Sequence, residues 1–218
     1  MDDKVRELKK RFRLAMNGVT SSYMREKGIN YKLNFGVSLP TIKQIAQKYT
    51  GDQELADRLL TENVRESLIV ATLIYPLDAV TPAKATEMAS KIEHLEIAEQ
   101  FSMNIFCKLP QAEALVMEWL DSDIKMVRIV GSITLVRTLM QGQKLSDENI
   151  SMVIEKLCST LERESNETEF FTAMNAIKRL GRVSQEVRAK ILDRISRVQS
   201  ERIMTIKAEL ETEFAYYA

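Results

Sequence analysis

The chain has 218 residues, of which 45% are hydrophobic and 28% are charged, a size and composition typical of a globular domain with a buried core. Lysine plus arginine and aspartate plus glutamate number 31 each, so the balanced charge excludes a uniform electrostatic attraction to nucleic acid. Any basic surface therefore has to come from an uneven distribution of charge along the chain.

Apolar residues recur at intervals of three and four along almost the whole chain, and alternation with period two is nearly absent. This periodicity predicts an all-α fold. The first amphipathic helix carries Val5, Met16 and Val19 on its apolar side and is expected to end at Gly28. After an irregular connection, Pro40 stands in the first turn of the next helix, where its missing backbone N–H needs no partner.

A second proline-initiated helix is predicted in TPAKATEMASKI, with Thr81 as the N-cap and Pro82 as the first helical residue. The remaining helices are expected over approximately residues 53–60, 63–75, 94–107, 111–120, 123–140, 147–163, 167–180 and 184–203. Four segments share an outline in which a polar start is followed by apolar residues: ENVRESLIVATLIYPL, HLEIAEQFSMNIFCKL, SDIKMVRIVGSITLVRTL and ETEFFTAMNAIKRLG. Their starts are spaced irregularly, at intervals around the period of two-helix repeats of the HEAT kind.

Repeats of this kind bury their apolar faces only against their neighbours and stack into an α-α superhelix, or solenoid. We therefore predict a single HEAT-like repeat domain that spans residues 1–218. It is expected to consist of an N-terminal helix in residues 1–30, stacked helix pairs in residues 31–203 and a C-terminal tail in residues 204–218. The concave face of such a stack is the usual place for an extended ligand such as DNA, RNA or a peptide.

Several segments indicate the compartment in which the protein works. The stretch MDDKVRELKKRFRL is too charged to contain the apolar region of a signal peptide, and the longest apolar run, residues 68–77, is much shorter than the roughly 20 residues of a bilayer span. Cys107 and Cys158 lie in apolar patterns without further ligands at zinc-site spacing, which favours buried, reduced thiols. The single tryptophan, Trp119, is likewise expected to be buried, by packing in the core. We expect a cytosolic protein that binds neither membrane nor metal.

The most uneven charge lies between Lys178 and Lys207, where nine basic residues stand against three acidic ones. Lys178 and Arg182 are one helical turn apart, so they are expected on one face. Such a cluster is the footprint of phosphate contacts, and the alternative is a solvated surface balanced by the acidic run ERESNETE, residues 162–169. The tail ELETEFAYYA, residues 209–218, either folds back on the last helix or pairs with something else.

The only histidine, His94, stands in HLEIAEQ, residues 94–100, close to two glutamates. A lone histidine without a paired nucleophile matches no catalytic triad, so we interpret His94 as a solvent-facing residue in the first turn of its helix. Glu96 is expected to face elsewhere than Leu95. For Glu99, a solvated helix surface and a groove-facing catalytic position remain equal alternatives.

Two longer motifs bear on function. SSYMREKGINYKLNFGVSLPTIKQIAQKY and VRESLIVATLI resemble successive segments of the bacterial DNA alkylation repair enzymes of the AlkD type. The resemblance extends from about Phe12 to Arg197 and implies a C-shaped stack of HEAT-like helices. It also implies a basic concave groove that holds double-stranded DNA, and cleavage of the glycosidic bond of alkylated purines without a cofactor or metal.

In that family, active members carry a tryptophan and, four residues later, an aspartate on the helix that matches residues 94–107. In this sequence the two positions are Leu95 and Glu99, so a carboxylate is retained and the aromatic ring is replaced. A pair with this spacing lies on one helix face, where the ring covers the sugar and the carboxylate faces the cationic charge that develops as the base leaves. A second family tryptophan corresponds to Ala176, and the family's arginine corresponds to Arg128, which is expected to bind a phosphate.

Two hypotheses follow from these observations. The first is a DNA glycosylase-like hydrolase in which Glu99 is catalytic and basic side chains grip the DNA backbone. These DNA-binding side chains are Arg128, Lys178, Arg179 and Arg182. The second is a catalytically inactive HEAT-like scaffold that binds DNA structures or a protein partner. The replaced aromatic positions, Leu95 and Ala176, and the neutral overall charge favour the second hypothesis.

Overall fold

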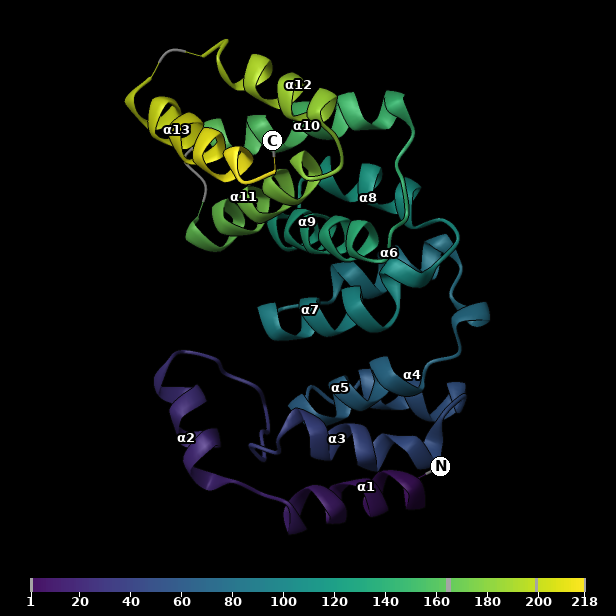
Figure 1. Cartoon of the computed structure of the whole chain (residues 1–218). Coiled ribbons are helices and arrows are strands. Elements are labelled where there is room, and N and C mark those ends of the chain that lie inside the picture. The colour runs from purple at the N-terminus through teal and green to yellow at the C-terminus, as the bar shows by residue number, and fades with distance from the viewer. Residues whose placement is uncertain (1, 164–165, 199, 218) are drawn as a thin grey trace. The chain divides into compact units, whose positions relative to one another are not determined.

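The structure is a computed structural model that describes residues 2–163, 166–198 and 200–217 (Figure 1). The part of the chain that it describes contains thirteen α-helices and no strand, which confirms the all-helical prediction. The helices are α1 (Asp2–Leu14), α2 (Gly18–Glu26), α3 (Leu39–Ala46), α4 (Gln53–Leu60), α5 (Arg65–Ile74), α6 (Pro82–Ser90), α7 (Leu95–Asn104), α8 (Ala112–Leu120), α9 (Lys125–Met140), α10 (Asp147–Glu162), α11 (Glu167–Gly181), α12 (Gln185–Ile195) and α13 (Glu201–Ala215). Three short 3-10 helices join them: η1 (Gln47–Tyr49), η2 (Leu77–Ala79) and η3 (Phe106–Lys108). No described helix has the length and apolar character needed to cross a membrane.

The helices form two compact units whose segments alternate along the chain. Unit 1 consists of residues 1–81 and 93–105, with helices α1 to α5 and α7. Unit 2 consists of residues 82–92 and 106–218, with helices α6 and α8 to α13. Residues 82–105 therefore contribute one helix to each unit, α6 to unit 2 and α7 to unit 1.

Helix α5 is the centre of unit 1. It packs against α3, α4 and α7, while α1 packs against α3 and α4. Most of its residues are buried, including polar ones at its N-terminus, because neighbouring helices cover several of its sides. The largest fully buried side chains of unit 1 are Leu8, Phe12, Ile42, Leu55, Leu59, Ile69, Ile74 and Ile105.

The N-terminal segment differs from its predicted form. The prediction of one helix that runs through Met16 and Val19 is wrong, because Asn17 ends the first helical stretch and caps a second helix. Its side chain accepts a hydrogen bond from Thr20 N at 3.0 Å, and its backbone N donates to Phe35 O at 2.9 Å. As a result, Met16 and Val19 are 60% and 83% exposed instead of lying on a buried stripe.

Two glycines shape this region. Gly28 follows α2 with φ +77°, so the predicted stop of the helix at this residue is confirmed. Gly36 has φ +68° and lies directly against the start of α2. A Cβ atom at Gly36 would stand 2.2 Å from Asn17 O and 2.9 Å from Ser21 N, so only glycine fits between these two stretches of backbone.

A buried carboxylate holds the loop that precedes α3. Glu66 is fully buried, and its two oxygens accept hydrogen bonds from Phe35 N and Val37 N, each at 3.1 Å. Arg65 Nη1 donates to the same carboxylate at 3.1 Å and to Val37 O at 2.9 Å. The first turn of α5 therefore satisfies backbone groups that would otherwise be buried without partners.

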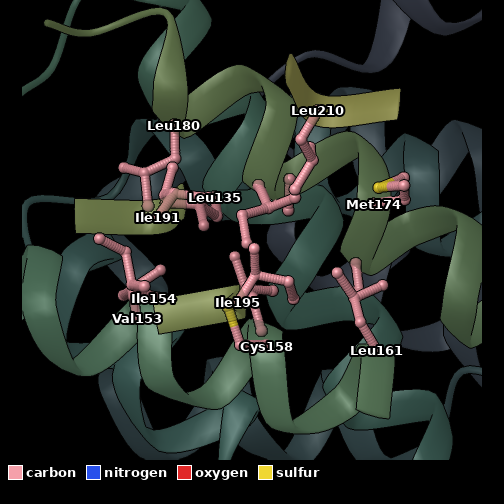
Figure 2. Packing of buried hydrophobic residues seen from close by; sticks show 14 of the residues in the cluster. Leu135, Val153, Ile154, Cys158, Leu161, Met174, Leu180, Ile191, Ile195 and Leu210 are labelled. Carbon is pink, nitrogen blue, oxygen red and sulfur yellow. The ribbon is translucent and has the colours of Figure 1, made fainter. Parts of the chain in front are cut away.

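Unit 2 is built around α9 and α11, which pack against each other. Helix α8 packs on α9, α10 and α12 pack on α11, and α13 contacts α10, α11 and α12. Figure 2 shows the core between these helices, where Ile154, Cys158, Leu180, Ile191 and Leu210 lie among other buried side chains. This core extends without interruption from α8 to α13.

The C-terminal part also departs from the prediction. The expected helix over 184–203 is divided into α12 and α13, and Ser200 caps α13 by accepting a hydrogen bond from Ile203 N at 3.2 Å. The tail then folds back on the preceding helices, as one of the two alternatives proposed. Phe214 is buried, and its ring occupies the space where a side chain at Gly181 would stand.

The single tryptophan and both cysteines are buried, as predicted. Trp119 donates from Nε1 to Thr86 Oγ1 at 3.0 Å, and its ring meets Phe106 edge-on with 4.8 Å between the ring centroids. Cys107 and Cys158 are free thiols. Helix α6 starts at Pro82, which confirms the predicted first helical residue.

Burial raises the pKa of the Cys158 thiol from 9.0 to about 12. The folded protein therefore keeps this proton between pH 9 and pH 12 while the unfolded chain loses it, so stability falls as the pH rises. Since one such proton contributes at most about 1.4 kcal/mol per pH unit, the stability advantage of the wild type over Cys158→Ala should shrink at that rate above pH 9. Urea unfolding monitored by circular dichroism measures the two stabilities. A stability difference between the wild type and Cys158→Ala that stays constant from pH 9 to pH 12 would contradict the prediction.

Candidate nucleic-acid interface

Helix α7 of unit 1 carries the proposed catalytic carboxylate. Glu99 is exposed, and Leu95, which is 39% exposed, lies one helical turn before it on the same side of the helix. Both side chains face solvent because the opposite side of α7, with Ile97 and Phe101, is buried. The predicted common face of Leu95 and Glu99 is thus present, and the carboxylate is accessible.

Glu96 has a structural task instead. Its carboxylate receives two hydrogen bonds from Arg65, from Nε at 2.8 Å and from Nη2 at 2.6 Å, and a third from Tyr31 Oη at 3.2 Å. Since the Arg65 guanidinium is buried, this ion pair compensates a charge that would be costly without a partner. Desolvation, with the negative charge of Glu96 as the next cause, raises the pKa of Tyr31 well above its usual range.

His94 is not the solvent-facing residue that was expected. It is the residue that precedes α7, and its ring lies against that of Tyr31, with 4.1 Å between the centroids. Its Nε2 atom is buried and has no hydrogen-bond partner among the described residues. No group of three His, Cys, Asp or Glu side chains suited to a metal ion occurs in the described ranges.

In unit 2, Arg128 projects from the first turns of α9. Its Nε donates to Glu169 Oε1 at 2.7 Å and its Nη1 donates to Ser122 O at 2.7 Å, so two of its three nitrogens are engaged. It lines a pocket of about 630 Å³ whose charged side chains include four carboxylates. These carboxylates are Asp121, Asp123, Glu155 and Glu162. A phosphate at Arg128 would therefore meet the Nη2 group and the second Nη1 N–H, and its neighbours would be these four carboxylates together with Lys156 and Arg163.

The cationic end of α11 consists of Lys178, Arg179 and Arg182. Lys178 and Arg182 share one face, as predicted, and they meet two glutamates that are likewise one turn apart on α13. Lys178 Nζ pairs with Glu209 at 2.5 Å, and Arg182 donates to Glu213 from Nε at 3.0 Å and from Nη2 at 2.5 Å. The acidic partners thus come from the tail.

Arg179 stands between these two pairs in the sequence and differs from both. Its Nη2 donates to Leu139 O at 3.3 Å, and it forms no ion pair with any residue that the structure describes. The guanidinium therefore keeps most of its donors for an external group. Among the three cations at this end of α11, Arg179 is the one whose charge has no carboxylate against it.

The rest of the basic segment is also largely paired. Arg194 binds two carboxylates of α10, those of Glu155 and Glu162, and these hydrogen bonds raise the pKa of the guanidinium. Lys190 pairs with Glu186 within α12, and Arg197, which follows that helix, pairs with Asp193. The acidic run 162–169, proposed as the balancing charge, contributes Glu162, and its residues 164 and 165 lie outside the described part.

The sequence model of the family described as DNA alkylation repair enzyme matches residues 7–204 of the chain, which is nearly its whole length. The chain belongs to the DNA alkylation repair enzyme family.

A solved structure supports the same fold. It is described as a new family of proteins related to the HEAT-like repeat DNA glycosylases with affinity for branched DNA structures, and its TM-score to this chain is 0.76 at 16% identity. The match covers 95% of this chain and 94% of that chain, so the predicted HEAT-like repeat fold is confirmed. A designed armadillo repeat protein in complex with the peptide (KR)4 is 16% identical over 80% of this chain and 92% of its own, with a TM-score of 0.39. No curated protein matches the chain.

The two positions that were expected to correspond to family tryptophans differ in their surroundings. Leu95 lies on the exposed face of α7, whereas Ala176 is fully buried within α11. Of the two residues next to Ala176 in the sequence, Asn175 is exposed and Ile177 is buried. Unit 2 therefore presents no aromatic ring at the Ala176 position or beside it.

Two features of this family member were missed by the sequence interpretation. Tyr217 lies beside the cationic end of α11, and the Arg182 guanidinium stands 4.9 Å from the centroid of its ring. The second feature is the exposed apolar side of α2 and the segment before it. It is formed by Leu14, Met16, Val19 and Tyr23. The late aromatics of ELETEFAYYA were the available signal for Tyr217, but their location depends on how α13 folds back.

Proposed function

We propose that the protein binds double-stranded and branched DNA through the cationic end of α11, formed by Lys178, Arg179 and Arg182. Membership of the DNA alkylation repair enzyme family supports DNA as the ligand, and the affinity of the structural relative for branched DNA supports the branched form. The observation that carries the proposal is the guanidinium of Arg179, which has no carboxylate partner among the described residues. A bacterial cytosol or nucleoid is the compartment that agrees with this ligand.

The two cations that are paired contribute in a different way. Glu209 and Glu213 form ion pairs with Lys178 and Arg182, and these pairs are partly exposed, so a phosphate can share the cations. Arg128 is assigned to a further phosphate contact through its Nη2 group, although Glu169 already neutralises part of its charge. The DNA backbone thus meets Arg179 as its strongest anchor and the other cations as weaker ones.

The salt dependence of binding tests the proposal. Phosphate contacts release counterions, so the affinity for a short fluorescent duplex should fall linearly on a double-logarithmic plot against salt concentration. Arg179→Ala is expected to weaken binding to all sequences and to reduce the magnitude of this slope by about 1. Fluorescence anisotropy titrations at several salt concentrations measure both quantities.

Lys43→Ala provides a matched control, because Lys43 is an exposed cation on α3 of unit 1. This variant should bind DNA as the wild type does. Binding that is independent of salt, or an Arg179→Ala variant with the wild-type slope, would contradict the proposal. Failure of the wild type to bind any DNA would favour a protein partner for the same surface.

A second candidate function is cleavage of the glycosidic bond of alkylated purines, with Glu99 as the catalytic carboxylate. One observation favours it: Glu99 and Leu95 lie on one exposed face of α7, which is the arrangement that the family chemistry requires of its carboxylate. The aliphatic Leu95 side chain replaces the ring that covers the sugar, so stacking worth roughly 1–3 kcal/mol is lost at this position.

Single-turnover release of methylated purines from duplex DNA tests this second function. If Glu99 is catalytic, Glu99→Gln should lower the release rate by roughly a hundredfold or more, while Glu93→Gln, at an exposed position just before the helix, leaves it unchanged. Absence of release by the wild type, in a preparation that still binds DNA, would leave DNA binding as the function.

A further inference from the structure

The pocket beside the cationic end of α11 has a distinctive lining. It measures about 370 Å³ and is bounded by Leu139, Arg179, Arg182, Val183 and Tyr217. Its volume is within the range of pockets that hold small molecules. All five lining residues belong to unit 2, and they come from the ends of α9 and α11 and from the residues that follow α13.

Tyr217 supplies an aromatic surface whose position is fixed. Its backbone N donates to Phe214 O at 3.0 Å, and Phe214 is buried against Gly181, so the residue is tied to the core of unit 2. The Arg182 guanidinium lies over the ring at 4.9 Å from its centroid, in the geometry of a cation–π contact. Tyr217 is nevertheless 44% exposed as a residue, so part of its surface is available to a ligand.

The remaining lining groups complement an anion attached to a flat apolar ring. Arg179 donates only one hydrogen bond within the described residues, to Leu139 O, and Arg182 is engaged with Glu213 through two of its nitrogens. Val183, which is exposed, and Leu139 provide aliphatic walls. Two guanidinium groups next to a phenol ring and aliphatic side chains match the chemistry of a nucleotide, with phosphate on the cations and base on the ring.

We propose that this pocket binds an unpaired nucleotide of a DNA strand, with its base stacked on Tyr217 and its phosphate held by Arg179 and Arg182. Base faces are covered by their neighbours in a regular duplex, so only a nucleotide that has left the stack offers a face to the ring. The inference rests on the proposed function, because Arg179 and Arg182 also belong to the cationic end of α11 that binds the duplex. It adds a reason why a branch with unpaired nucleotides binds more tightly than a blunt duplex.

The test compares a blunt duplex with the same duplex carrying a short single-stranded flap that contains 2-aminopurine. The wild type should bind the flapped DNA more tightly, and the fluorescence of 2-aminopurine should change on binding as the base stacks on the ring. Tyr217→Ala is expected to lose roughly tenfold in affinity for the flapped DNA and to abolish the fluorescence change, whereas Tyr217→Phe retains both. Anisotropy and 2-aminopurine emission give the two readouts.

Tyr216→Ala is the matched control, because Tyr216 is the adjacent aromatic residue, is 82% exposed and does not line the pocket. If the wild type binds neither the blunt duplex nor the flapped DNA, the proposed function is overturned. If the wild type binds the blunt duplex and Tyr217→Ala binds the flapped DNA as tightly as the wild type does, only the assignment of the pocket is overturned. Competition by a free deoxynucleoside monophosphate, without any preference for the flap, would assign the pocket to free nucleotides and overturn its role in strand binding.

Discussion

Replacement of Glu66 by glutamine is expected to lower the free energy of unfolding by about 3 kcal/mol. The carboxylate is fully buried and accepts hydrogen bonds from Phe35 N, Val37 N and Arg65 Nη1. An amide has one acceptor oxygen and an NH2 group, so one backbone N–H would face a donor, and the buried guanidinium would lose a counter-charge. Urea unfolding followed by circular dichroism measures the loss.

Glu54→Gln is the control for this prediction, because Glu54 is an exposed glutamate on α4 of the same unit. Its unfolding free energy should stay within about 0.5 kcal/mol of the wild-type value. If Glu66→Gln unfolded with the wild-type midpoint, the buried carboxylate would not be what holds residues 35–37 against α5. Arg65→Met tests the same network a second time, because it removes the other charge; its free energy of unfolding is measured in the same way.

Gly36→Ala is the second substitution with a large expected effect, a destabilisation of about 3 kcal/mol. The methyl group would stand 2.2 Å from Asn17 O, which is a backbone atom and cannot rotate away as a flexible side chain can. The positive φ of 68° adds strain of its own for an L-residue. We expect α2 to separate from the loop around Gly36, with faster amide hydrogen exchange at Ser21 and its neighbours.

Gly28→Ala separates the cost of the steric contact from the cost of the positive φ. Gly28 has a similar φ of +77°, but nothing lies within 4 Å of the position that its Cβ would take. This variant should therefore lose only about 1 kcal/mol, which is the cost of the left-handed backbone alone. Equal losses in the two variants would contradict the close contact between Gly36 and the start of α2.

The sequence predicted the helices well where local signals agree. Pro82 starts α6 as expected, and the apolar periodicity of residues 147–163 and 167–180 reappears as α10 and α11. The break at Asn17 was missed because Met16 and Val19 continue the apolar spacing of α1. The side-chain N-cap of Asn17 on Thr20 N was a local signal that this spacing outweighed, whereas the hydrogen bond from Asn17 N to Phe35 O joins segments far apart in the chain and leaves no local signal.

The candidate interface was predictable only in part, for the same reason. Helical spacing was sufficient to place Lys178 and Arg182 on one face, and Leu95 and Glu99 on another. The carboxylates that neutralise Lys178 and Arg182 could not be predicted, because Glu209 and Glu213 reach these cations only once α13 has turned back along α11. Net charge along the segment therefore overestimated the free positive charge at the end of α11, where Arg179 is the one of the three cations without a carboxylate partner among the described residues.

The alternation of α6 and α7 between the two units affects how the protein is made. Helix α7 packs on α5, yet it leaves the ribosome only after α6, which belongs to the other unit. During synthesis the side of α5 that packs on α7 therefore stays uncovered until residue 105 has emerged, while α6 has its partners α8 and α9 only later. A nascent chain arrested between these points exposes hydrophobic surface of both units at once, and exposed surface of this kind is what chaperones protect from aggregation.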